Sequence, residues 1–395
     1  MEKHSMRHLL WTALFLLYCS CGCLAAVVQQ LPQKGESALQ AYTVATTAES
    51  DDKNGEEWKP IRIAVYTKLV EDIMEYCERK KKQDNVFYND LEEKFEQFGD
   101  HCEEENANVM TPQKKDILFK EVLPKAIKLH ADRLSVKVKQ EEEDLKITNI
   151  IDQDYCVDFK IPEEHKTHGI PDVDFMIYVS LSTNSIGRWI CSRGGENRPT
   201  SALIKFVPEY IEATRQYIRL TAHEIAHGLG FDHKVMETLV MIEPRENDLL
   251  STGGSSSAKK FYMNSSETLE ILKKHYNCKK NELKGFYLEN EPNERAPPHC
   301  ERRIAKDELM SAYSDTLGVT GMYYTKLTLA VFHSMPFYSA NFNMAEPMSW
   351  GKDLNVSYLR VKRIQQRLTI PLCFAKMMTR IPYSALLTVL PLVCA

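Results

Sequence analysis

The sequence lacks an apolar run long enough to cross a membrane as a helix, which needs about 20 residues. Its two apolar runs cover only residues 9–18 and 381–395. The chain also lacks an excess of basic residues, because its net charge is −5, so no nucleic-acid partner is expected. No internal repeat is visible. With 43% hydrophobic and 27% charged residues among 395, the composition is that of a globular protein.

The N-terminal segment, residues 1–26, has the features of a secretory signal peptide. Basic residues flank a short apolar core, and small residues follow it up to Ala25 and Ala26. We therefore expect a secreted, extracellular protein, and the short core disfavours the alternative of a retained anchor. Asn264 and Asn355 each begin a glycosylation sequon, which predicts surface positions in a glycoprotein.

The mature chain would keep eight cysteines, and none of them forms a CxxC pair. CxxC pairs are typical of structural zinc sites, so their absence argues against such a site. An even number of cysteines suits an oxidising compartment. Disulfide bonds are therefore the favoured interpretation.

Hydrophobic periodicity predicts an α+β fold with a mixed sheet. Residues 27–57 are polar and without a periodic apolar pattern, which predicts a flexible leader or short propeptide. Predicted strands cover residues 61–66, 175–179 and 202–207, and predicted helices cover residues 114–134 and 210–229. Pro124 is expected to start or kink the first helix. Gly230 can end the second in a left-handed conformation.

The second predicted helix carries the run His223-Glu224-Ile225-Ala226-His227. Residues four apart share a helix face, so His223 and His227 can present two imidazoles to one metal ion, with Glu224 beside them. This arrangement suits a catalytic zinc with Glu224 as the general base. The alternative is that the spacing arose by chance on an ordinary amphipathic helix. The buried helix, the exported chain and the following Gly230 favour the metal site.

A catalytic zinc needs a third protein ligand. His233 completes the pattern His-Glu-x-x-His-x-x-Gly-x-x-His, in which the third histidine directly follows the turn. His299 is the rival candidate. Either histidine could supply the remaining nitrogen.

About three quarters of the chain resembles the leishmanolysin (invadolysin) family of zinc metallopeptidases, within the metzincin clan. The most telling stretches are TAHEIAHGLGF at residues 221–231, YYTKLT at 323–328 and AEPMSWG at 345–351. Similar blocks occur in the same order at residues 58–67, 114–134, 172–179, 221–231, 307–310 and 323–351.

The resemblance implies a metzincin-like catalytic domain with an active-site helix and a mainly helical C-terminal subdomain. In this family a long insertion precedes the third histidine, which implies His299 as the third ligand, with His233 as the alternative. Met310 would be the Met-turn residue, an apolar floor under the ligands. The implied disulfides are Cys77 with Cys102 and Cys156 with Cys191. The implied segments are residues 58–232 and 299–355 for the two catalytic subdomains, 233–298 for the insertion and 356–395 for a divergent, truncated tail.

The chain departs from the family in three places. Residues 27–57 contain no cysteine, so latency through a thiolate that caps zinc is not expected. Cys300 follows His299 directly, where it could pair with Cys278 or lie near the zinc as a thiolate. The resemblance stops after Gly351, and Cys373 and Cys394 in the tail lack evident partners.

These observations predict a secreted endopeptidase that holds one zinc ion per chain and acts on protein or peptide substrates. A monomer is expected, and association with a cell surface stays open. The alternative is a catalytically weak adhesion or decoy protein with the same fold, although Glu224 has no purpose in such a protein. A third interpretation is a chain that does not fold stably.

Overall fold

The computed structural model describes residues 27–29, 39–44, 57–82, 95–102, 106–138, 144–151, 156, 161–245, 260–278, 283–289, 298–312 and 321–353. The predicted signal peptide, the predicted tail and the sequon at Asn355 lie outside these residues. Asn264 is half-buried at the end of a strand. Within the described part of the chain, no helix has the length and apolar character that a membrane crossing requires.

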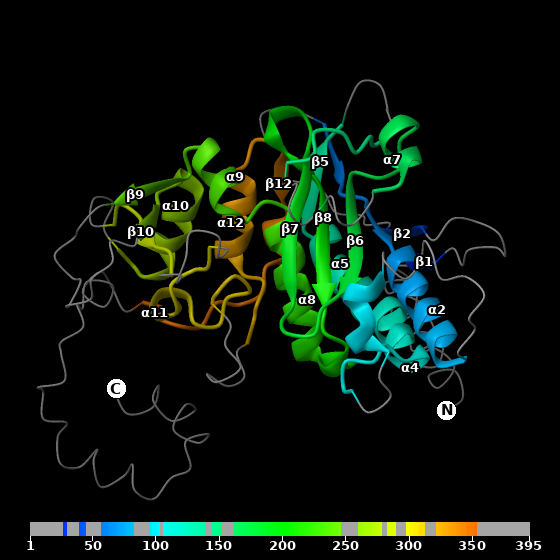
Figure 1. Cartoon of the computed structure of the whole chain (residues 1–395). Helices are drawn as coiled ribbons and strands as arrows, with labels where there is room; N and C mark the ends of the chain where they lie inside the picture. Colours follow the sequence, from blue (N-terminus) through cyan, green and yellow to red (C-terminus); the bar gives the residue numbers. More distant parts are fainter. Residues whose placement is uncertain are drawn as a thin grey trace, which may run out of the picture.

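A six-stranded mixed sheet forms the centre of the N-terminal part (Figure 1). Its order is β1-β2-β4-β6-β8-β7, and β4, β6 and β8 run parallel while β2 and β7 are antiparallel to their neighbours. The strands are β1 Val27–Gln29, β2 Leu39–Val44, β4 Ile63–Tyr66, β6 Phe175–Leu181, β7 Gly187–Arg193 and β8 Pro199–Phe206. Strand β7 is therefore an edge strand.

Strands β1 and β2 lie within the segment that was predicted to be a flexible leader. Strand β2 pairs with β4, and β1 pairs with β2. A strand can join a sheet edge through backbone hydrogen bonds alone, without an apolar periodicity of its own. The polar sequence therefore did not predict β1 and β2.

Both faces of the sheet are covered, which explains the near-continuous apolar runs of its central strands. Ile177 and Ile204 belong to the main core, where helices α2 Lys68–Lys82 and α8 Arg215–Gly228 pack on the sheet. Met176 and Leu203 alternate with them and belong to a smaller core on the other face. That second core includes Cys156 and Cys191.

The predicted helix 114–134 is divided into three pieces. These are α4 Pro112–Asp116, the π-helical η2 Ile117–Val122 and α5 Leu123–Ala131. Pro124 cannot donate a backbone hydrogen bond, so the irregular turn lies directly before it. Leu134 does not belong to the helix, since it begins strand β5 Leu134–Lys137.

Helix α8 begins later than its apolar pattern suggested. Pro208–Tyr210 forms the short helix η4, and α8 starts at Arg215 after the cap Thr214, whose side chain accepts a hydrogen bond from the Tyr217 amide at 3.2 Å. Strand β4 likewise begins two residues after its predicted start, at Ile63, and residues 58–60 form the separate strand β3 Trp58–Pro60.

The C-terminal part contains the predicted insertion and the mainly helical subdomain (left side of Figure 1). The insertion holds a three-stranded sheet, β11-β10-β9, and two helices. A third sheet, β12-β5-β3, joins the two parts of the chain. The elements are α9 His233–Thr238, β9 Ile242–Arg245, β10 Lys260–Met263, α10 Ser266–His275, β11 Phe286–Tyr287, α11 Arg302–Ala305, α12 Lys326–Ser334 and β12 Tyr338–Ala340. The remaining short elements are η1 Glu96–His101, α7 Glu163–Thr167, η3 Gly195–Asn197 and η6 Phe342–Met344.

Two disulfides occur at the positions that the resemblance implied. Cys77 of α2 is bonded to Cys102, with the Cα atoms 4.8 Å apart, and Cys156 is bonded to Cys191 of β7, with the Cα atoms 5.6 Å apart. The structure does not join Cys278 to Cys300. The suggested pairing of these two cysteines was therefore wrong.

Candidate metal centre

Helix α8 presents His223 and His227 one turn apart on a buried face. The helix ends in a Schellman motif, because the Phe231 amide donates to the Ala226 carbonyl and the Gly230 amide donates to the His227 carbonyl, both at 3.1 Å. Gly230 has φ +124°, a conformation that favours glycine. The turn at Gly230 thus brings the Phe231 carbonyl back toward the helix.

Three imidazoles converge at this end of α8. The Nε2 atom of His223 lies 3.0 Å from that of His227 and 3.1 Å from that of His299, and the third Nε2 distance is 3.3 Å. His299 comes from a segment 72 residues beyond His227, next to strand β11. Among the described residues these three form the only group of histidines, cysteines and carboxylates with metal-ligand spacing.

Backbone carbonyls fix the orientation of two of the rings. His223 Nδ1 donates to the Leu309 carbonyl at 2.6 Å, and His227 Nδ1 donates to the Phe231 carbonyl at 2.7 Å. Each neutral ring then has its proton on Nδ1 and its lone pair on Nε2. Burial, as the largest cause, holds the pKa of both rings well below the ordinary range, so they stay neutral near pH 7.

The spacing and the tautomers fit a tetrahedral metal ion. A tetrahedral zinc bound to nitrogens at about 2.0–2.1 Å places those nitrogens roughly 3.3 Å apart. Lone pairs of His223 and His227 that face each other cannot hydrogen-bond to one another, and a shared cation relieves their repulsion. His233 is not part of this cluster. It begins α9 and its ring lies 4.4 Å from that of Phe261 of β10, centroid to centroid.

Glu224 follows the first histidine and is 5% exposed. Burial raises the pKa of its carboxyl group, and the positive charge of Arg188 opposes part of that rise. Arg188 Nε, from the edge strand β7, lies 3.2 Å from Glu224 Oε2. The Glu224 carboxylate thus lies on the same helical turn as His223 and is held in an ion pair from the edge strand.

The segment after His299 supports the cluster through its backbone. The Cys300 amide donates to the Met310 carbonyl at 2.7 Å, and Leu309 receives the bond from His223. The Met310 side chain is fully buried. Burial, aided by the charges of Glu308 and Glu289, raises the pKa of the Cys300 thiol well above its usual range, and the thiol does not belong to the group with metal-ligand spacing.

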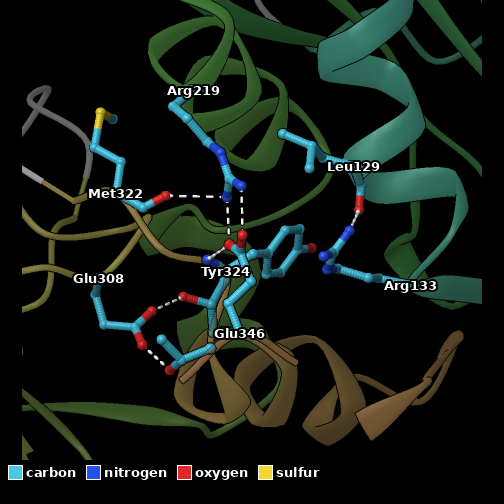
Figure 2. A network of polar contacts seen from close by, with 9 residues as sticks. Leu129, Arg133, Arg219, Glu308, Met322, Tyr324 and Glu346 are labelled. Atoms are coloured by element: carbon cyan, nitrogen blue, oxygen red, sulfur yellow. Dashed lines mark hydrogen bonds and ion pairs between the residues drawn. The ribbon is translucent and has the colours of Figure 1, made fainter. Parts of the chain in front are cut away.

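A buried polar network ties α8 to the C-terminal segment (Figure 2). Arg219, one turn before His223, forms an ion pair with Glu346 and donates to the Met322 carbonyl at 3.2 Å. Glu346 also accepts a hydrogen bond from the Tyr324 amide at 2.7 Å. Glu308 accepts hydrogen bonds from the hydroxyl groups of Thr325 and Thr328. The network therefore connects both chain segments that provide histidines.

His130 of α5 holds the same helix from another side. Its Nε2 donates to the Ala222 carbonyl at 2.8 Å, and its Nδ1 accepts from the Tyr324 hydroxyl at 3.2 Å. Burial lowers the pKa of His130 to about 3, so the ring is neutral at working pH. Neither His130 nor Arg188 belongs to a spaced motif, so the sequence did not mark either residue as functional. An arginine inside an otherwise half-buried strand was the only available signal.

Comparison with known proteins places these observations in a family. The sequence profile described as Leishmanolysin matches residues 22–381. This match continues beyond Gly351, so the expectation that the resemblance stops there was wrong.

Three similar proteins illustrate the range of the match. The leishmanolysin of Leishmania tropica is 30% identical over 321 residues, which cover 79% of this chain and 45% of that protein. The leishmanolysin of Leishmania chagasi is 29% identical over 359 residues, 84% of this chain and 54% of that protein. The leishmanolysin-like peptidase of Drosophila melanogaster is 26% identical over 236 residues, 48% of this chain and 34% of that protein. The chain spans about half the length of the first two relatives.

Proposed function

The chain belongs to the leishmanolysin peptidase family, and we propose that it is a secreted, zinc-dependent endopeptidase. The observation that carries this proposal is the convergence of three Nε2 atoms within 3.3 Å of one another, beside the buried Glu224. His223, His227 and His299 are the proposed ligands, one zinc ion per chain. A zinc ion bound there would lower the pKa of water and polarise a peptide carbonyl.

Glu224 is the proposed general base. Its carboxylate takes a proton from the attacking water and later delivers that proton to the nitrogen of the leaving amine. The place of Glu224 on α8, directly after the proposed ligand His223 and 5% exposed, supports this role.

Residues Gly187–Ile190 of strand β7 are the proposed docking edge for an extended substrate. These residues are partly exposed. In the described parts of the chain, the only pairing of β7 outside β8 is a bridge between Ser192 and Ile150. An extended peptide can add to such an edge through backbone hydrogen bonds with little dependence on sequence. The proposed substrates are accordingly proteins or peptides.

Secretion is supported by the N-terminal sequence features and by two disulfides, which persist in oxidising compartments. Within the proposed mechanism, Met310 is a buried packing residue near the ligands, and Asn264 is a proposed glycosylation site. We also propose that the protein is a monomer and that it can associate with a cell surface.

The test is Glu224→Ala, compared with wild type in metal analysis and in cleavage of casein or a quenched peptide. We expect zinc to stay near one ion per chain while kcat falls by about 10²–10⁴-fold, because the base is lost and the ligands remain. Cleavage by the variant at the wild-type rate would refute the assigned role. A wild-type protein that binds zinc but cleaves nothing would favour the adhesion or decoy interpretation.

A further inference from the structure

Arg188 is a charged side chain inside the candidate site to which the proposed mechanism gives no role. It pairs across the sheet with Ile204 of β8, whose side chain lies in the core on the α8 side. Directly cross-strand neighbours share a face of the sheet. Arg188 therefore lies on the α8 side of the edge strand, and its side chain is 16% exposed.

The guanidinium lies close to two of the three proposed ligands and to the proposed base. Its charge acts on His223 and His227 as well as on Glu224. A positive group near a bound dication is unfavourable, and Glu224 alone offsets only part of the combined charge. The site therefore has capacity for one more negative charge.

The contacts of the Arg188 guanidinium indicate where that charge would be received. Nε lies 3.2 Å from Glu224 Oε2, whereas Nη2 is buried and has no hydrogen-bond partner among the described residues. Nε and Nη2 belong to one rigid, planar fork, so an acceptor of Nη2 lies near the acceptor of Nε. Buried donors without a partner are uncommon and costly, by about 1–3 kcal/mol.

We propose that Arg188 is a catalytic residue whose Nη2 donates to the anionic oxygen formed on the scissile carbonyl, while Nε holds Glu224. This inference rests on the proposed endopeptidase function. It assigns to Arg188 the electrostatic stabilisation of charge that develops only during the reaction.

The step balances with water as the only co-reactant. The water oxygen forms a bond to the carbonyl carbon, its proton moves to Glu224, and the carbonyl π pair moves onto the oxygen that faces Arg188. On collapse that pair reforms the carbonyl, the C–N bond breaks, and the proton on Glu224 moves to the amine nitrogen. Arg188 stays protonated throughout, as its high pKa requires.

The position of Arg188 agrees with the proposed docking edge. A peptide that pairs with Gly187–Ile190 has its backbone carbonyls beside the strand that carries Arg188. The same strand then aligns the substrate and provides the donor, so the donor needs no reorganisation during the reaction.

The test compares Arg188→Met with the matched control Arg193→Met. Arg193 is on the same strand, with 15% side-chain exposure, but it pairs with Asp232 at 3.7 Å and not with Glu224. For Arg188→Met we expect unchanged zinc stoichiometry, a kcat lower by about 10²–10³-fold and a KM within about threefold of wild type. Affinity for a phosphinic peptide, which carries a tetrahedral anionic oxygen, should fall by a similar factor. Affinity for a product peptide should not. Arg193→Met should retain the wild-type kcat.

Several outcomes would overturn the inference. An unchanged kcat in Arg188→Met is one, and equal loss of affinity for the phosphinic and product peptides is another. If Arg188→Met does not fold, Arg188→Lys keeps the charge without the fork, and a wild-type kcat in that variant would be equally decisive. Failure of the proposed function is distinct, because the wild-type protein would then lack zinc or cleave no peptide.

Discussion

Replacing His299 with alanine tests the candidate metal centre most directly. The Nε2 atom of His299 lies 3.1 Å and 3.3 Å from those of His223 and His227, so the substitution removes one of three proposed ligands. The backbone there is held on both sides of the substitution. The Glu289 amide donates to the His299 carbonyl at 2.8 Å and the Cys300 amide donates to the Met310 carbonyl at 2.7 Å, so the variant should fold.

The magnitude follows from the number of ligands. A structural zinc site with four protein ligands has an apparent binding free energy of about 10–16 kcal/mol, or roughly 2.5–4 kcal/mol per ligand if shared equally. Loss of one ligand should then weaken zinc binding by about two to three orders of magnitude. Competition with a chelator of known affinity, at fixed pH, measures this change.

His233→Ala is the matched control. This substitution removes a ring that contacts Phe261 outside the cluster. We expect its zinc affinity to stay within about threefold of wild type and its activity to change modestly at most. Loss of zinc from the His233 variant, with zinc retained by the His299 variant, would reverse the assignment of the third ligand.

Two further predictions concern the supports of the site. Gly230→Ala should destabilise the protein by about 1–3 kcal/mol and weaken zinc binding, because φ +124° strains alanine and the turn carries the carbonyl that orients His227. Gly195→Ala, where no atom lies within 4 Å of the added Cβ, is the control in urea unfolding, and equal effects would refute the argument. Burial raises the pKa of Glu308 to about 8, so the stabilising effect of its neutral form is present below pH 4.5 and is lost as pH rises through 8. Glu308→Gln should therefore gain stability relative to wild type between pH 6 and 9 in zinc-saturated protein, and a difference independent of pH would contradict this.

Local sequence patterns predicted elements well where periodicity was strong and less well at their ends. Strands β6 and β8 and helix α8 lie where their apolar residues indicated. Helix α8 begins five residues after the predicted start at 210, because Pro208–Tyr210 forms a separate turn and Thr214 provides the cap. The leader strands gave no signal, since their pairing depends on the backbone.

The sequence by itself determined the helix with its two histidines and the glutamate, because helical spacing is a local property of the chain. It left the third histidine open between His233 and His299, and only the resemblance favoured His299. Tertiary structure decided which histidine joins the cluster, because a contact across 72 residues depends on how the insertion folds and returns. The same holds for Arg188 and His130. Their partners lie on α8, far along the chain, and strand pairing and helix packing bring them together.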